Sequence, residues 1–141
     1  MTMIDWSISF AEAMKGELKI LLIEDDDDTR DIMVRLIRRL GCEVRAASTA
    51  ADGIAILDRW RPTHILLDLM MPDRPGSDVL RHVRQCNLPM RVAVVTGAGP
   101  GSEALADARK AGPDAVFPKP VQFDEIESWL NAPTAERARN H

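Results

Sequence analysis

The segment Asp114-Ala115-Val116-Phe117-Pro118-Lys119-Pro120 contains the last of four short apolar runs that each lead into a polar residue. The other three are Ile20-Leu21-Leu22-Ile23, followed by Glu24-Asp25, then Ile65-Leu66-Leu67, followed by Asp68, and Val92-Ala93-Val94-Val95, followed by Thr96. Continuous apolar runs of this length are typical of strands in a parallel sheet that is buried on both faces. Because the carboxyl ends of parallel strands share one edge, we expect the polar residues to meet there, where open α/β sheets place their sites.

Helix-like amphipathic segments alternate with the strand-like runs, which predicts a doubly wound α/β fold of five parallel strands with helices on both faces. The strands are expected near residues 19–23, 43–47, 64–68, 91–96 and 114–117. The helices are expected near residues 28–40, from Ser48-Thr49 to Pro62, and near 77–86, 102–111 and 123–130. The apolar side of the first helix is expected to comprise Ile32, Val34, Leu36, Ile37 and Leu40.

The chain has 141 residues, the size of one domain, which we expect over residues 18–131. Residues 132–141 read as a polar tail. Residues 1–17 read as an N-terminal extension with a helical pattern, because four apolar residues share one helical face: Trp6, Phe10, Ala13 and Met14. Three interpretations of this extension stay open: a helix packed on its own domain, a helix that binds a partner or a second copy, and a segment without order.

Composition excludes several classes of protein. Hydrophobic residues make up 45% of the chain, enough for a packed core, and the net charge of −4 gives no electrostatic reason to expect nucleic-acid binding. No apolar run approaches the ~20 residues that span a bilayer, and the N-terminus lacks the pattern of a secretion signal. Cys42 and Cys86 show no C-x-x-C spacing, so reduced thiols and a cytoplasmic location are expected.

The polar residues at the strand ends suggest a chemistry. The carboxylates of Glu24, Asp25 and Asp68 would repel one another at a shared edge, and a divalent cation among them would remove the conflict. Hard oxygen ligands favour Mg²⁺. With the ammonium of Lys119 and the hydroxyl of Thr96, the set suits attack of an aspartate oxygen on phosphorus, because cations neutralise the phosphoryl oxygens.

Four motifs follow one another along the chain: Ile20-Leu21-Leu22-Ile23-Glu24-Asp25-Asp26, Leu66-Leu67-Asp68-Leu69-Met70-Met71-Pro72 with Gly76, Val94-Val95-Thr96-Gly97, and Pro118-Lys119-Pro120. The separations are 43 residues from Asp25 to Asp68, 28 more to Thr96 and 23 more to Lys119. In residues and spacing this set resembles the receiver domains of response regulators in two-component signalling. The resemblance covers about residues 18–131.

The resemblance implies a flavodoxin-like sheet with strand order 2-1-3-4-5. It implies that Asp68 is the phosphoacceptor. It also implies that Glu24, Asp25 and Asp68 hold Mg²⁺ (or Mn²⁺), with the backbone carbonyl of Met70 as a further ligand.

In the same family a hydroxyl and an aromatic residue form the switch. The resemblance makes Thr96 the switch hydroxyl and Lys119 the cation that contacts the phosphoryl group. The aromatic residue usually lies three positions before the lysine, where this chain has Val116, followed by Phe117. Two interpretations stay open: Val116 is a packing residue without a switching role, or the strand register slips so that Phe117 takes the role.

Two further expectations concern the loops beside the site. The positions that tune hydrolysis of the acyl phosphate in this family hold Met70 and Ala98, neither of which orients water, so we expect a phosphorylated form that lasts minutes or longer. The segment Gly97-Ala98-Gly99-Pro100-Gly101 is rich in glycine and is expected to become ordered when phosphate arrives, rather than to be a plain loop.

The resemblance implies a signalling protein rather than an enzyme, expected to stand alone because no output domain follows residue 131. Its expected partners are a histidine kinase or histidine phosphotransfer protein and a downstream protein target, with no nucleic acid and no membrane. The arginine-lined side of the first helix, with Arg35 and Arg38, is the expected docking surface for the phosphoryl donor. A relay shuttle and a direct regulator both stay open, as do a monomer and a phosphorylation-dependent homodimer built on the fourth and fifth helices.

Two alternatives compete with this function. Asp25-Asp26-Asp27-Asp28-Thr29 also matches the D-x-D-x-T motif of haloacid-dehalogenase phosphatases, with Asp25 as nucleophile and Asp27 as acid and base. The other alternative is a degenerate receiver that binds partners without being phosphorylated. His64 and His82 are expected to be structural or solvent-facing, whereas Trp129 reads equally as a packed residue or a dimer contact.

Overall fold

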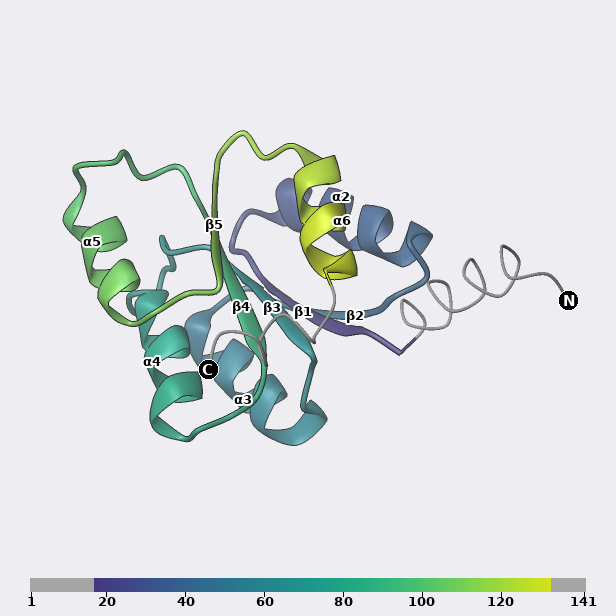
Figure 1. Ribbon diagram of the computed structural model, residues 1–141, viewed down its shortest axis with the longest axis horizontal. Coiled ribbons are helices and arrows are strands. Elements are labelled where there is room, and N and C mark those ends of the chain that lie inside the picture. Colours follow the sequence, from purple (N-terminus) through teal and green to yellow (C-terminus); the bar gives the residue numbers. More distant parts are fainter. Residues whose placement is uncertain (1–16, 133–141) are drawn as a thin grey trace, which may run out of the picture.

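The computed structural model describes residues 17–132, so the expectations for residues 1–16 and 133–141 lie outside the described residues. Five strands form one sheet in the middle of the molecule (Figure 1). They are β1 (Lys19–Ile23), β2 (Glu43–Ala47), β3 (His64–Leu67), β4 (Arg91–Thr96) and β5 (Ala115–Pro118). All neighbouring strands are parallel, and their order, β2-β1-β3-β4-β5, confirms the predicted flavodoxin-like fold.

Each strand is followed by a helix, as the alternating pattern predicts. The helices are α2 (Asp27–Arg39), α3 (Ala50–Trp60), α4 (Ser77–Gln85), α5 (Glu103–Lys110) and α6 (Phe123–Asn131). Asp26, Thr49 and Ser102 cap three of them by accepting a hydrogen bond from a backbone N–H of the first turn. Gly41 follows the end of α2 with φ of 90°, a left-handed conformation that glycine adopts without steric cost.

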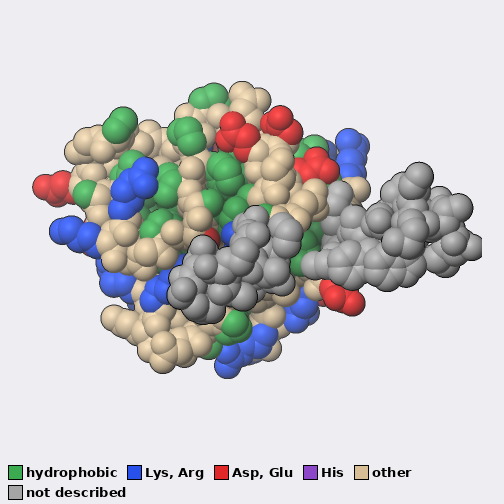
Figure 2. Space-filling view, in the orientation of Figure 1, with side chains coloured by type: hydrophobic (Ala, Val, Ile, Leu, Met, Phe, Trp, Pro, Cys, Tyr) green, Lys and Arg blue, Asp and Glu red, His purple; other side chains and the backbone are tan. Residues whose placement is uncertain are grey.

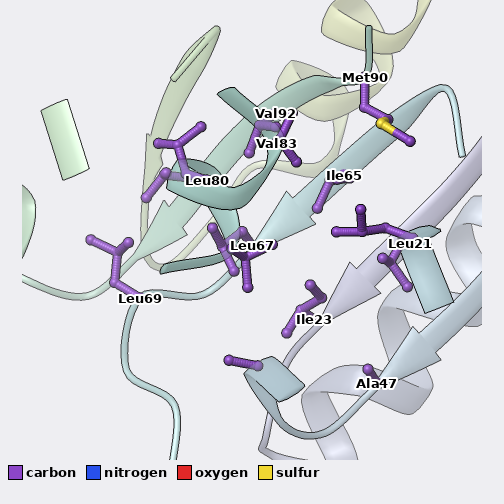
Figure 3. Close-up of a cluster of buried hydrophobic side chains, with 14 of the residues drawn as sticks. Leu21, Ile23, Ala47, Ile65, Leu67, Leu69, Leu80, Val83, Met90 and Val92 are labelled. Carbon is purple, nitrogen blue, oxygen red and sulfur yellow. The ribbon is translucent and has the colours of Figure 1, made fainter. Parts of the chain in front are cut away.

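The helices cover both faces of the sheet, and the side chains of each strand alternate between these faces (Figure 1). Leu21, Ile65 and Val92 belong to the core cluster that packs beneath α3, α4 and α5 (Figure 3). Their neighbours Leu22, Leu66 and Ala93 belong to the second cluster, beneath α2 and α6. The sheet is therefore buried on both faces, which explains why its strands read as continuous apolar runs.

One prediction about the core is wrong. Ile32 was expected on the apolar side of α2, but it is 56% exposed. Met33 is buried instead, together with Ile37, which lies four residues later on the same helical face. The buried side of α2 therefore lies about one residue further round the helix than the sequence predicted.

The structure places His64 and His82, which were expected to be structural or solvent-facing, and Trp129, whose position was left open. His64 is buried, with its ring in an edge contact with Trp129 at 5.1 Å between centroids, and its Nδ1 lies 2.8 Å from Thr63 Oγ1. His82 lies at the surface, where its Nε2 is 2.9 Å from Asp58 Oδ1. Trp129 is buried in the second core cluster, so it is a packed residue.

None of the helices within residues 17–132 has the length and apolar character that crossing a bilayer requires.

Candidate functional site

Four polar residues meet at the carboxyl edge of the sheet. Glu24 follows β1, Asp68 follows β3, Thr96 ends β4 and Lys119 follows β5. Glu24, Asp68 and Thr96 are buried, with exposed fractions of 4%, 6% and 2%. The structure therefore brings together the polar residues that the strand-end pattern predicted, although β3 ends at Leu67, one residue earlier than expected.

The ammonium group of Lys119 joins the two buried carboxylates. Its Nζ lies 2.9 Å from Oε1 of Glu24 and 2.9 Å from Oδ2 of Asp68. The other oxygen of each carboxylate accepts a backbone hydrogen bond, from Asp26 N at 3.1 Å for Glu24 and from Met70 N at 3.0 Å for Asp68. All four carboxylate oxygens thus have a donor, which is the condition for holding such groups away from water.

Burial shapes the electrostatics of this pair. Burial raises the pKa of Glu24 above its ordinary value, although the hydrogen bonds from Lys119 and Asp26 oppose the change. Burial alone would lower the pKa of Lys119, but its hydrogen bonds to Asp68 and Glu24 outweigh that effect and raise it. Lys119 therefore carries its positive charge throughout the physiological pH range. A cavity of about 260 Å³, lined mainly by apolar side chains such as Leu66, adjoins Glu24, Asp68 and Lys119.

Asp25 completes an acidic cluster. Ligand oxygens of Glu24, Asp25 and Asp68 lie within 4.8 Å of one another, with Asp25 exposed to solvent. Three carboxylates and one ammonium, that of Lys119, leave two negative charges that a divalent cation would balance. Because all three acids offer hard oxygen ligands, the donor set fits Mg²⁺ or Mn²⁺.

The loop after β3 closes tightly beneath Asp68. Gly76 N donates to the carbonyl of Leu69 at 3.0 Å. A Cβ on Gly76 would lie 2.3 Å from the backbone oxygen of Asp68 and 2.8 Å from Cα of Leu69. Only glycine fits there, which gives a physical reason for Gly76 in the motif. Met70 lies at the start of this loop and is 61% exposed, and its backbone N–H donates a hydrogen bond to Oδ1 of Asp68.

Thr96 connects the ends of β4 and β5. Its Oγ1 accepts a hydrogen bond from Ala98 N at 3.0 Å, and its carbonyl accepts one from Lys119 N at 2.9 Å. Thr96 is therefore bonded through its hydroxyl to the glycine-rich loop and through its carbonyl to the residue that follows β5.

The register of β5 decides between the two interpretations of the switch position. Val94 pairs with Val116 and Thr96 with Pro118, so Val116 lies on the same side of the sheet as Thr96 and Phe117 on the other side, which favours the first interpretation. Val116 packs against the core cluster beneath α3, α4 and α5, whereas Phe117 packs on the other face of the sheet, 6.3 Å from the ring of Trp129. A valine thus holds the position that is usually aromatic in the family.

Two further acids of the Asp25-to-Asp28 run have local structural partners. Asp26 caps α2 by accepting hydrogen bonds from N and Oγ1 of Thr29, at 2.8 and 2.6 Å. Asp27 pairs with Arg30 at 2.6 Å. Asp27 is the second acid of the D-x-D-x-T pattern, and its pairing with Arg30 explains it as part of the helix start, whereas Asp26 lies between the two acids of the pattern. The sequence analysis missed the capping role of Asp26, although the Asp-x-x-Thr spacing was its signal.

Removing the ammonium would leave the buried acids unpaired. We expect Lys119→Met to lower the free energy of unfolding by about 2 kcal/mol, less than for a fully buried pair because the Lys119 side chain is 31% exposed. Urea unfolding followed by tryptophan fluorescence without Mg²⁺ measures this change. Lys110→Met, at an exposed lysine of α5, is the control. Equal stability of the two variants would contradict the pairing.

The chain has relatives of known class. A family model described as the response regulator receiver domain matches residues 20–131. The chain is 30% identical over 115 residues to response regulator MprA of Mycobacterium leprae, which covers 82% of this chain and 50% of MprA. It is 30% identical over 113 residues to transcriptional regulatory protein AfsQ1 of Streptomyces coelicolor, covering 80% of this chain and 49% of AfsQ1. The chain thus spans about half the length of the curated relatives that it matches.

Solved structures give the same assignment. A CheY-like response regulator receiver domain protein from Methanospirillum hungatei matches with a TM-score of 0.75 and 26% identity, covering 88% of this chain and 98% of that chain. A DNA-binding response regulator of the LuxR family from Staphylococcus aureus matches with a TM-score of 0.73 and 26% identity, covering 82% and 99%. The residues that the family model matches include the whole acidic site and all of the sheet except Lys19, and the chain belongs to the receiver domain family of response regulators in two-component signalling.

Proposed function

We propose that Asp68 accepts a phosphoryl group from a histidine kinase or a histidine phosphotransfer protein, in a reaction that needs Mg²⁺. The observation that carries this proposal is the contact of Lys119 Nζ with both Glu24 and Asp68, at 2.9 Å each, beside the exposed acid Asp25. This arrangement supports the proposal because a buried carboxylate lies beside a positive charge and other carboxylate oxygens.

The cation would be held by Glu24, Asp25 and Asp68 and by the backbone carbonyl of Met70. When bound, it supplies positive charge that neutralises the phosphoryl oxygens in the transition state. Lys119, which follows β5, supplies a second positive charge, and its hydrogen bonds to both carboxylates hold Asp68 in place. Thr96, at the end of β4, supplies a hydroxyl that donates to the phosphoryl group once it is on Asp68.

The transfer itself is a displacement at phosphorus. An oxygen of Asp68 forms the new O–P bond while the P–N bond to the donor imidazole breaks, and the imidazole leaves with the electron pair and takes up a proton. The product is a mixed anhydride of the aspartate. Lys119 and the metal site would both neutralise the negative charge of the phosphoryl oxygens. The positions of these groups, rather than acid–base chemistry, are therefore expected to set the rate.

The phosphoryl donor is expected to dock on α2. Arg35 and Arg38 are exposed on this helix, which begins directly after the acidic loop. We expect Arg35→Glu combined with Arg38→Glu to slow transfer from the cognate phosphohistidine at least about tenfold. Charges at the edge of a protein–protein interface mainly set the association rate, and the double substitution reverses two of them. Rapid-quench phosphotransfer measures the rate. Arg109→Glu, an exposed arginine on α5, is the control. Unchanged transfer by the α2 variant would refute this docking surface.

The phosphorylated form is expected to last minutes or longer at neutral pH. Met70 and Ala98, the positions expected to govern hydrolysis, carry side chains without a polar group that orients water. Loss of the phosphoryl group can be followed by intact-protein mass spectrometry after the donor is removed. A half-life of seconds would show that other groups activate water.

The output is proposed to be contact with other proteins, either as a relay that passes the phosphoryl group on or as a direct regulator. Figure 2 shows hydrophobic side chains gathered between α5 and α6, a surface suited to a phosphorylation-dependent homodimer. We propose that the domain of residues 18–131 works in the cytoplasm and does not itself bind nucleic acid.

The most economical test of the chemistry uses acetyl phosphate and Mg²⁺. The proposal predicts one acid-stable, base-labile phosphoryl group per chain, on the peptide that contains Asp68. Continued turnover with label on Asp25 would favour the phosphatase alternative, which the family assignment does not support. No label at all would favour the degenerate receiver.

A further inference from the structure

Asp73 reaches from the loop between β3 and α4 to the start of a different helix. Its Oδ1 accepts a hydrogen bond from Ala50 N at 3.0 Å, and its Oδ2 accepts one from Ala51 N at 2.9 Å. Both carboxylate oxygens are therefore used on the first two residues of α3. These hydrogen bonds, that from Ala51 being the stronger influence, hold the pKa of Asp73 below its usual range, so the group is charged at neutral pH.

The helix that receives this contact is connected to the backbone of Glu24, one of the acids of the site. α3 follows β2 directly, and the last residue of β2, Ala47, accepts a hydrogen bond through its carbonyl from Glu24 N at 3.0 Å. α3 also has its own cap, because Thr49 Oγ1 accepts from Asp52 N at 3.1 Å. Asp73 thus connects the loop of the phosphoacceptor with the backbone around Glu24.

The outer part of the loop has few other restraints. Its base is closed by Gly76 N on the Leu69 carbonyl, and Met71 packs partly against the core. Pro72, Asp73 and Arg74 are exposed. Within the described part of the chain, Asp73 makes the hydrogen bonds that join residues 70–74 to another helix or strand.

We propose that Asp73 is a positioning residue for the cation site. By tying the loop to α3, it holds the backbone at Met70 close to Glu24, Asp25 and Asp68, so that its carbonyl joins them as a ligand. This inference rests on the proposed function, because it assigns Asp73 a role toward the same Mg²⁺. Groups that orient metal ligands without touching the metal typically change metal affinity about 10- to 100-fold when they are removed.

The test compares the Mg²⁺ affinity of the wild-type chain with that of three variants by isothermal titration calorimetry. Asp73→Ala removes the tether and should weaken Mg²⁺ binding about tenfold. Asp73→Asn keeps one acceptor oxygen and should fall between Asp73→Ala and the wild type. Thr49→Ala removes the other cap of the same helix without touching the loop. Its Mg²⁺ affinity should therefore equal that of the wild type, and thermal unfolding confirms that all three variants are folded.

A second readout separates positioning from chemistry. In phosphorylation by acetyl phosphate, Asp73→Ala should need about ten times more Mg²⁺ for half-maximal rate, and saturating Mg²⁺ should restore the wild-type rate. If Thr49→Ala weakens Mg²⁺ binding as much as Asp73→Ala does, Asp73 is only a helix cap and the inference fails. Unchanged affinity in Asp73→Ala also overturns it. Failure of the proposed function gives a different result, because the wild type itself would then bind no Mg²⁺.

Discussion

Replacing Asp68 with Asn is expected to reduce phosphorylation to background, a loss of at least about a thousandfold in rate. The amide has the shape of the carboxylate but lacks a nucleophilic oxygen, so no bond to phosphorus can form. The variant should still fold, because Asn keeps an acceptor for Lys119 and its replacement of Asp68 removes one of the charges that repel Glu24. Intact-protein mass spectrometry after incubation with a phosphohistidine donor measures the loss.

A matched control is available in the same acidic region. Asp27 is exposed at the start of α2 and pairs with Arg30, away from the contacts of Lys119. Asp27→Asn should be phosphorylated at close to the wild-type rate. Phosphorylation of the Asp68 variant at a similar rate would mean that another residue is the acceptor.

Gly76→Ala is expected to lower the free energy of unfolding strongly. Among the glycines of residues 17–132 without a positive φ, we expect it to be the most destabilising replacement by alanine. The new Cβ would lie 2.3 Å from the carbonyl oxygen of Asp68 and 2.8 Å from Cα of Leu69, which are backbone atoms that cannot turn away. The loop must shift, and overpacking of this kind costs about 3 kcal/mol. Urea unfolding gives the free-energy change.

The control for this prediction is a glycine with open space around it. A Cβ on Gly99 would meet no atom within 4 Å, so Gly99→Ala should change the free energy of unfolding by less than about 0.5 kcal/mol. Because Gly76 packs against the phosphoacceptor itself, Gly76→Ala should also slow phosphorylation. Equal stability of the two variants would show that the loop adapts without cost.

Most of the fold could be predicted because its signals are local. The apolar runs of β1, β3 and β4 lie on a sheet buried on both faces, and polar residues follow them directly. The error at Ile32 shows the limit of such patterns. On a helix whose apolar side holds several adjacent hydrophobic residues, a rotation of one residue leaves the pattern nearly unchanged, and only the packing against the sheet decides that Met33 faces inward.

The site was predictable in its members but not in its connections. Strand ends share an edge in any parallel sheet, so Glu24, Asp68 and Lys119 were expected together. No local pattern could show that Asp73 caps a helix that begins 23 residues earlier, because that contact depends on how two loops approach each other. The register of β5, which sets Val116 rather than Phe117 on the side of Thr96, likewise comes from strand pairing.

The central claim is that three acids and one lysine form a single site for a cation and a phosphoryl group. A crystal structure with Mg²⁺ and beryllium trifluoride, a stable mimic of a phosphoryl group, tests it most directly. We predict the beryllium on an oxygen of Asp68, a cation among the carboxylates of Glu24, Asp25 and Asp68, and Lys119 Nζ on a fluorine. A mimic on Asp25, or a cation bound away from these three acids, would contradict the account.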